Sequence, residues 1–173
     1  MPDLRIVFTE ARIQERIAGM AREIDAVYGE EPLVAVCVLK GAVHFFSDLS
    51  RRLRNPAVEL DFVRLSSYGN ATASSRHVTF SKDVDCDVRG KHVLIVEDVV
   101  DSGHSMRFLA AQFRARGVAS LRIAALIDKM ERREVGVCVD FVGFQLERGY
   151  IVGCGMDCAE RYRALPAVYE LLS

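Results

Sequence analysis

The residues best suited to chemistry lie together between positions 93 and 106. An apolar run leads directly into two adjacent carboxylates, Glu97 and Asp98, and a turn of small residues at 101–105 then opens a predicted helix. Consecutive backbone N–H groups, serine hydroxyls and the positive end of a helix dipole make such a turn a binding site for an anion. The sequence therefore predicts a cradle for a phosphate monoester.

Glu97 and Asp98 are adjacent at the end of a predicted strand, so we expect that they do not both point into the core. A solvated acidic turn is one interpretation of this pair. Because the phosphate cradle follows closely, the pair also suits the 2′ and 3′ hydroxyls of a ribose, or a magnesium ion that touches them. Neither a Walker A loop nor the fingerprint Gly-x-Gly-x-x-Gly occurs after any strand. The expected ligand is a ribose 5-phosphate.

Predicted helices and strands alternate along the chain. Apolar residues at steps of three and four from Ile13 to Val27 predict an amphipathic helix that begins near Thr9 and ends at Gly29. Strands are predicted at 33–39, 58–62, 92–96, 121–127, 138–142 and 150–152, and further helices at 43–53 and 105–116. This order is typical of a single doubly wound, mostly parallel α/β sheet flanked by helices, here one domain over residues 1–173. Such sheets bind ligands beyond the carboxyl ends of their strands.

Composition narrows the classes of protein further. The chain has 173 residues, of which 50% are hydrophobic and 27% charged, and its net charge is −1. We therefore expect a folded protein whose overall field attracts neither nucleic acid nor an anionic membrane. No apolar run is long enough for a spanning helix, and charges near the N-terminus interrupt the apolar core that a signal peptide needs. A cytoplasmic location is expected.

The five cysteines are expected to be reduced thiols, because their number is odd and no Cys-x-x-Cys pair occurs. Cys37 and Cys138 lie in apolar runs and are predicted to be buried. For Cys154 and Cys158, a nucleophilic role beside a histidine such as His104 is the less favoured interpretation.

Several motifs together resemble those of the purine phosphoribosyltransferases that act on hypoxanthine, guanine or xanthine. Residues 93–106 are similar to the phosphoribosyl-pyrophosphate motif of that family. Further matches occur in the family order between positions 34 and 165: Leu39-Lys40-Gly41-Ala42, Leu65-Ser66-Ser67-Tyr68-Gly69, Ile127-Asp128-Lys129 with Arg132-Arg133, Phe141-Val142-Gly143-Phe144, Val152-Gly153 with Gly155 and Asp157, and Arg161-Tyr162-Arg163. The acidic motif alone indicates only the broad class, whereas the ordered set is specific to the 6-oxopurine branch.

The resemblance implies a type I phosphoribosyltransferase fold with a small hood and a mobile lid loop. It also implies a magnesium-dependent transfer from phosphoribosyl pyrophosphate to hypoxanthine, guanine or both. The ribose and a magnesium ion are then expected at Glu97 and Asp98, and a second magnesium ion at Asp157. The remaining groups are expected as follows: the 5-phosphate at Asp101, Ser102, Gly103, His104 and Ser105, the pyrophosphate at Lys40, Gly41, Arg133 and Arg163, and the purine at Lys129, Tyr150 and Ile151.

Asp101 is the residue expected to move a proton. The reaction passes through a ribose cation, and attack by purine N7 or N9 is helped when a carboxylate accepts the ring proton. A helix cap is the structural alternative for Asp101 and is compatible with that role. The Lys129 ammonium would donate to the 6-oxo group and discriminate against adenine, while the Tyr150 ring would stack on the base.

Residues 66–75 contain no charged side chain, which suits a lid that closes over the reacting centre and excludes water. Ser67 and Tyr68 match the family lid and are expected near the catalytic centre. An ordinary surface loop is the alternative.

Two segments depart from the family pattern. Glu147-Arg148-Gly149 stands where many relatives have a Pro-Asp turn, which predicts a more flexible approach to Tyr150. Met130-Glu131 stands where bacterial relatives commonly have a proline. The ranking of hypoxanthine, guanine and xanthine stays open.

Two other functions remain as alternatives: a regulatory protein that keeps the site as a sensor, and a transferase for orotate or adenine. The family also implies a homodimer or homotetramer, and Phe45 or Phe46 is expected either at such an interface or in the core.

Overall fold

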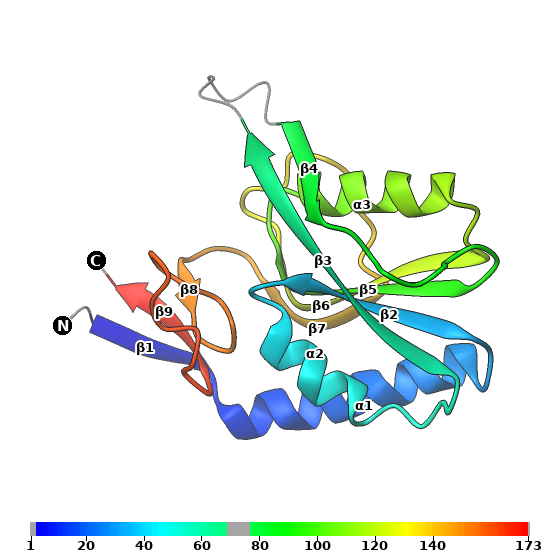
Figure 1. The fold of residues 1–173 in the computed structure, drawn as a ribbon. Helices are drawn as coiled ribbons and strands as arrows, with labels where there is room; N and C mark the ends of the chain where they lie inside the picture. The colour runs from blue at the N-terminus through cyan, green and yellow to red at the C-terminus, as the bar shows by residue number, and fades with distance from the viewer. Residues whose placement is uncertain (1–2, 69–76, 173) are drawn as a thin grey trace.

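The computed structural model describes residues 3–68 and 77–172, which form two sheets (Figure 1). The larger sheet has six strands in the order β4-β3-β2-β5-β6-β7. Their bounds are β2 Leu33–Leu39, β3 Val58–Tyr68, β4 His77–Lys82, β5 His92–Val100, β6 Ser120–Lys129 and β7 Phe141–Leu146. All neighbours are parallel except β3 and β4. The predicted mostly parallel sheet is confirmed.

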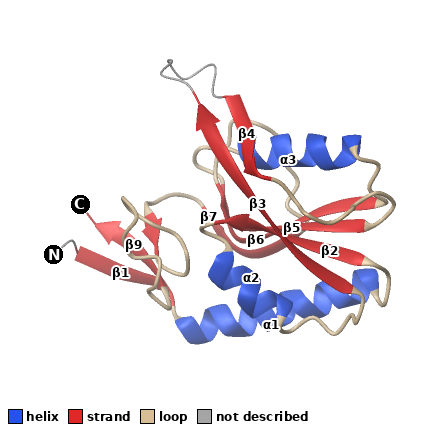
Figure 2. Ribbon diagram, in the orientation of Figure 1, coloured by secondary structure: helices blue, strands red, loops and turns tan. Residues whose placement is uncertain are grey.

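Helices cover both faces of this sheet, as Figure 2 shows, so the sheet is doubly wound. On one face lie α1, Glu10–Tyr28, and α2, Val43–Ser50, and on the other lies α3, His104–Ala115. Within the described ranges, no helix is both long and apolar enough to cross a bilayer.

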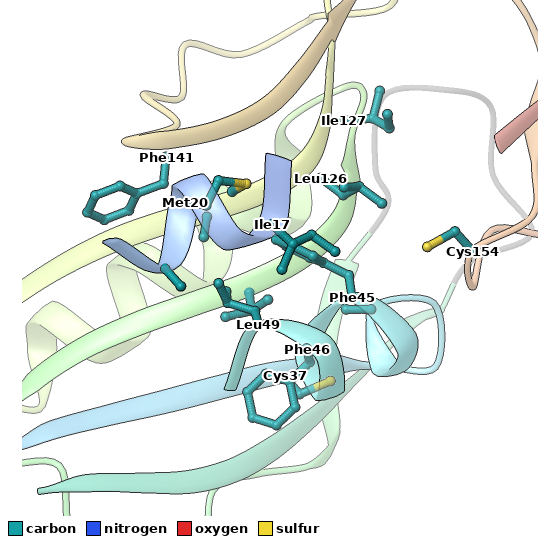
Figure 3. Close-up of a cluster of buried hydrophobic side chains, with 14 of the residues drawn as sticks. Ile17, Met20, Cys37, Phe45, Phe46, Leu49, Leu126, Ile127, Phe141 and Cys154 are labelled. Carbon is teal, nitrogen blue, oxygen red and sulfur yellow. The ribbon is translucent and has the colours of Figure 1, made fainter. Parts of the chain in front are cut away.

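Alternation along β2 explains why both faces are covered, because successive side chains of a strand point to opposite faces. Leu33, Ala35 and Cys37 join the core under α1 and α2. Val34 and Val36 join the core under α3. The first core also contains Phe45 and Phe46, which are 0% and 3% exposed (Figure 3), so both belong to the interior of the molecule.

α1 begins and ends as predicted. The Thr9 hydroxyl accepts a hydrogen bond from the Arg12 N–H at 3.4 Å, and Gly29 closes the helix with φ of +55°. Val27 is the exception on its apolar face, because it is 45% exposed while Tyr28 is buried in its place.

The second sheet forms the expected hood and lies beyond the carboxyl ends of the parallel strands (Figure 1). Its antiparallel strands have the order β1-β9-β8, with bounds Asp3–Phe8, Val168–Leu172 and Ile151–Val152. β1 and β9 were not predicted, since each is a short segment and they pair with each other from opposite ends of the chain.

Some predicted boundaries are wrong. β7 begins at Phe141 and not at 138, so Cys138 lies outside the strand and is exposed, not buried. α2 ends at Ser50, three residues before the predicted end at Leu53. β4 was not predicted at all.

A buried carboxylate, Asp61 of β3, fixes the connection between β4 and β5. It is 5% exposed and accepts hydrogen bonds from the N–H groups of Asp85 and Cys86 at 2.8 and 2.9 Å. Burial alone would raise the pKa of Asp61, but the backbone hydrogen bonds, including one from Phe62, outweigh it and lower the pKa below its usual value.

We expect Asp61→Asn to lower the free energy of unfolding at pH 7 by about 1–3 kcal/mol, because the amide replaces a charged acceptor. The folded pKa lies below the unfolded value of about 3.9, so the contribution of Asp61 is present above that value and is lost as the pH falls through the folded pKa. Urea unfolding at pH 7 and pH 3 measures the difference. Asp85→Asn, whose side chain is 86% exposed, is the control, and a pH-independent effect of Asp61→Asn would contradict the assignment.

Candidate active site

The acidic pair lies inside β5 and not beyond its end, because the strand continues to Val100. Glu97 and Asp98 are 9% and 8% exposed, so the interpretation of this pair as a solvated acidic turn is wrong. Alternation across the sheet makes room for both. Glu97 lines a cavity on the α3 side, and Asp98 lines a cavity that faces the hood.

Burial is the main cause that raises the pKa of Glu97 well above its usual range, and the charge of Asp98 raises it further. Burial also raises the pKa of Asp98, although hydrogen bonds from Glu97 and the Val99 N–H, and the charge of Arg163, oppose this. The two buried carboxyl groups thus lie close together with little positive charge nearby to balance them. A bound cation would supply that charge.

The phosphate turn, residues 101–105, joins β5 to α3. Gly103 is the residue before the helix and has φ of +89°. A Cβ atom there would lie 2.9 Å from the Val135 carbonyl oxygen, so both conformation and space require glycine. A cavity of about 130 Å³ opens over the turn and is lined by Glu97, Ser102 and Ser105 among others. Its size and its N–H groups suit a phosphate.

Asp101 sits where the two cavities meet and lines both. The cap of α3 is Gly103, with no side-chain cap hydrogen bond, so the alternative role of Asp101 as a helix cap is not realised. Its Oδ1 is buried without a hydrogen-bond partner among the described residues. An unpaired buried carboxylate oxygen is costly. The other oxygen, Oδ2, is the one open to a ligand, since the side chain as a whole is 35% exposed.

The second cavity, of about 180 Å³, brings the predicted purine residues together with the acidic ones. Lys129, Tyr150 and Ile151 line it with Asp98, Asp101 and Asp157. The Lys129 Nζ lies 4.0 Å from Asp101 Oδ2, and the lysine side chain is only 8% exposed. The Tyr150 ring is half exposed, and its hydroxyl donates to the Asp157 carbonyl oxygen at 3.2 Å. A flat base could therefore lie against Tyr150 with one edge toward Lys129.

Two glycines allow three backbone segments to converge beside Asp98. A Cβ atom on Gly41 would lie 2.0 Å from Asp98 Oδ2, and one on Gly155, where φ is +98°, would lie 1.8 Å from the Gly41 carbonyl oxygen. The peptide bond between Leu39 and Lys40 is cis. A side chain at Gly41 would displace the Asp98 carboxylate, and one at Gly155 would push its own segment away from Gly41.

One functional candidate was not predicted from the sequence. Glu160 lies between two side chains predicted to bind pyrophosphate. Its Oε2 is 3.1 Å from Lys40 Nζ and 3.4 Å from Arg163 Nη2. Lys40 is the main cause that lowers the pKa of Glu160. Arg163 also pairs with Asp157 at 2.7 Å. Nothing in the sequence marks Glu160, because only the fold brings it to Lys40.

Arg133, which was predicted to bind the pyrophosphate, is held by groups of the protein itself. Each of its three guanidinium nitrogen atoms donates to the protein, and its side chain is only 13% exposed. The acceptors are backbone carbonyl oxygens around the phosphate turn and the Asp128 carboxylate.

Among the described residues, no three His, Cys, Asp or Glu side chains form a ready-made metal site. Magnesium commonly uses only one or two carboxylates, with waters and substrate oxygens completing its shell. Glu97 and Asp98 fit such a role, because they are adjacent, buried and poorly compensated. Asp157 is already held by Arg163 and by the Glu160 N–H.

The two departures from the family pattern meet in space. The Glu131 carboxylate lies 3.5 Å from Lys129 Nζ and accepts a hydrogen bond from the Gly149 N–H at 3.3 Å. Gly149 has φ of +111°, a conformation that favours glycine. The unusual turn is therefore tied to the lysine end of the cavity.

The remaining predicted residues lie partly outside this description. Ser67 and Tyr68 end β3, where they pair with β4, while residues 69–75 of the expected lid lie outside the described residues. His104 Nε2 lies 2.7 Å from Glu134 Oε2. All five cysteines are free, and burial raises the pKa of Cys154 to about 12, which argues against a nucleophilic thiolate.

Comparison with known proteins agrees with this geometry. Residues 7–158 match the model of the phosphoribosyl transferase domain. The chain is 39% identical over 173 residues to the hypoxanthine-guanine phosphoribosyltransferase of Bacillus subtilis, with 96% of each chain covered. It is 42% identical over 171 residues to the hypoxanthine phosphoribosyltransferase of Salmonella typhimurium, covering 98% of this chain and 96% of that one.

Solved structures show the same similarity. A hypoxanthine-guanine phosphoribosyltransferase from Bacillus anthracis, with a HEPES molecule in the active site, has a TM-score of 0.92 at 38% identity and covers 99% of both chains. A ternary substrates complex of the Trypanosoma cruzi hypoxanthine phosphoribosyltransferase has a TM-score of 0.92 at 35% identity, over 97% and 95% of the two chains. The chain therefore belongs to the phosphoribosyltransferase family, in its hypoxanthine-guanine branch.

Proposed function

We propose that this protein is a purine salvage enzyme that transfers the phosphoribosyl group of phosphoribosyl pyrophosphate to a 6-oxopurine, hypoxanthine or guanine. The observation that carries the proposal is the position of Asp101. It lines both the cavity over the phosphate turn and the cavity of Lys129, whose Nζ is 4.0 Å from its carboxylate. A nucleotide that spans both cavities would place its glycosidic bond beside Asp101.

In the proposed reaction, the bond between ribose C1′ and the pyrophosphate oxygen breaks and the oxygen keeps the electron pair. A purine ring nitrogen attacks C1′, and its proton passes to the Asp101 carboxylate. Oδ2 is the accessible acceptor, because Oδ1 is buried while the Asp101 side chain as a whole is 35% exposed. Lys129 donates to the 6-oxo oxygen, while Tyr150 holds the ring by stacking.

Glu97 and Asp98 would hold one magnesium ion, and Asp157 would hold a second ion on the side of the leaving pyrophosphate. The ion would neutralise charge on the pyrophosphate as it leaves. Lys40 and Arg163 supply positive charge on the same side, and Gly41 lets the backbone approach closely. The closing of a lid that carries Ser67 and Tyr68 would keep water from the ribose cation.

The chemistry of Lys129 sets the class of base. A buried ammonium gains a hydrogen bond from an oxo acceptor, whereas the amino group of adenine offers it no acceptor. The same chemistry disfavours a transferase for adenine. A sensor that binds phosphoribosyl pyrophosphate without transfer would not need Asp101 and Lys129 together. We further expect a cytoplasmic enzyme that assembles as a homodimer or homotetramer.

We expect Asp101→Asn to reduce kcat about 10²- to 10⁴-fold, the range of one general base, with little change in the binding of phosphoribosyl pyrophosphate. The assay supplies magnesium, phosphoribosyl pyrophosphate and, in parallel, hypoxanthine, guanine, xanthine, adenine and orotate. It also ranks the bases.

The matched control is Asp85→Asn, an exposed carboxylate outside both cavities, which should keep full activity. If the wild-type protein bound phosphoribosyl pyrophosphate saturably but turned over none of the five bases, the sensor would replace the enzyme.

Glu160 offers a second test, since its carboxylate lies where the pyrophosphate is expected. Glu160→Gln should tighten the binding of magnesium pyrophosphate about 2- to 5-fold, because Lys40 and Arg163 lose a competing anion that makes only exposed ion pairs. Isothermal titration calorimetry measures the change. Weaker binding in the variant would show that Glu160 belongs to the pyrophosphate site and does not compete with it.

A further inference from the structure

Arg133 joins the carboxyl ends of two neighbouring strands. Its Nε donates to the Asp101 carbonyl oxygen at 2.9 Å, and its Nη2 donates to the Val100 carbonyl oxygen at 3.1 Å, both at the end of β5. The same Nη2 donates to the Lys129 carbonyl oxygen at 3.2 Å and to the Asp128 carboxylate, both at the end of β6. One guanidinium thus bridges the two strands.

This bridge begins where the sheet stops. The parallel pairing of β5 with β6 ends at Val100 opposite Asp128. Beyond this pair the two segments separate toward different parts of the site. β5 leads into the phosphate turn through Asp101, whereas β6 ends at Lys129. A planar guanidinium with several fixed donors can replace the missing ladder bonds, which a single ammonium cannot do.

The segment that carries Arg133 also holds the phosphate turn from outside. The N–H groups of Glu134 and Val135 donate to the Ser102 carbonyl oxygen at 3.0 and 3.2 Å. Gly103 packs so closely on Val135 that no side chain fits between them. Residues 130–137 therefore connect the turn to the end of β6.

We propose that Arg133 is a positioning residue that sets the spacing between the phosphate turn and Lys129, and that it is not a pyrophosphate ligand. The inference rests on the proposed function, because it concerns the two ends of the nucleotide product. A nucleotide contacts both the turn and Lys129, so its binding depends on their spacing. In the proposed function pyrophosphate lies at Lys40 and Arg163 and not at the turn or Lys129, so its binding does not depend on their spacing.

The experiment measures the affinity of the whole protein for inosine 5′-monophosphate, and separately for magnesium pyrophosphate, by isothermal titration calorimetry. Arg133→Lys keeps the charge but loses the fork of donors. We expect nucleotide affinity to fall about 10-fold or more, since small misplacements of binding groups are costly, and pyrophosphate affinity to stay within about 2-fold. Arg114→Lys, an exposed arginine of α3, is the matched control and should change neither affinity.

Asp128→Asn changes the acceptor that pairs with Arg133 at the end of β6. It provides an independent test of the proposal if Arg133→Lys does not fold. Asp128 is 8% exposed and pairs with the buried guanidinium. A positioning role predicts the same selective loss of nucleotide binding in this variant. A pyrophosphate ligand predicts the reverse, because Asp128→Asn would free Arg133 and tighten pyrophosphate binding.

Selective loss of pyrophosphate binding in Arg133→Lys would overturn the proposal, as would unchanged nucleotide binding or equal loss of both ligands. Failure of the wild-type protein to bind the nucleotide is a separate result, which would overturn the proposed function and the inference with it. The wild-type titration therefore distinguishes the two failures.

Discussion

The register of β5 against β6 is the constraint on which the site depends. Because Val100 lies opposite Asp128, the next residue of each strand, Asp101 and Lys129, emerges at the same edge of the sheet. A shift of one residue would turn each side chain of the shifted strand to the other face. The acidic pair obeys the same rule, since alternation sends Glu97 to one cavity and Asp98 to the other.

The parts of the site that are local in sequence could be predicted from it. The apolar strand, the acidic pair and the small-residue turn are contiguous, and their chemistry follows from residue type and order. α1 could also be predicted, because its apolar spacing and its capping residues Thr9 and Gly29 indicate the same helix bounds. The burial of Glu97 and Asp98 was misjudged, because β5 continues past them to Val100 and keeps both carboxylates inside the molecule.

The parts that were missed depend on contacts between distant residues. Glu160 meets Lys40 across 120 positions of sequence, and no local pattern announces such a pair. The contacts of Arg133 with carbonyl oxygens at the ends of β5 and β6 were not predicted either, because the sequence does not show which carbonyl groups the fold leaves unpaired. The hood strands β1 and β9 are short and pair from opposite ends of the chain. The other neighbour of β9, β8, has two residues, so no local pattern marks either strand.

The hood has a consequence for the order in which the molecule acquires its shape. β8 carries Ile151, which lines the cavity of Lys129. Among the described residues β8 pairs with β9 alone, and β9 closes the largest loop with β1. Closing a long loop costs more conformational entropy than forming neighbouring βα units. The large sheet and its phosphate turn can therefore form first. A partly folded chain would hold a phosphate before it could recognise a base.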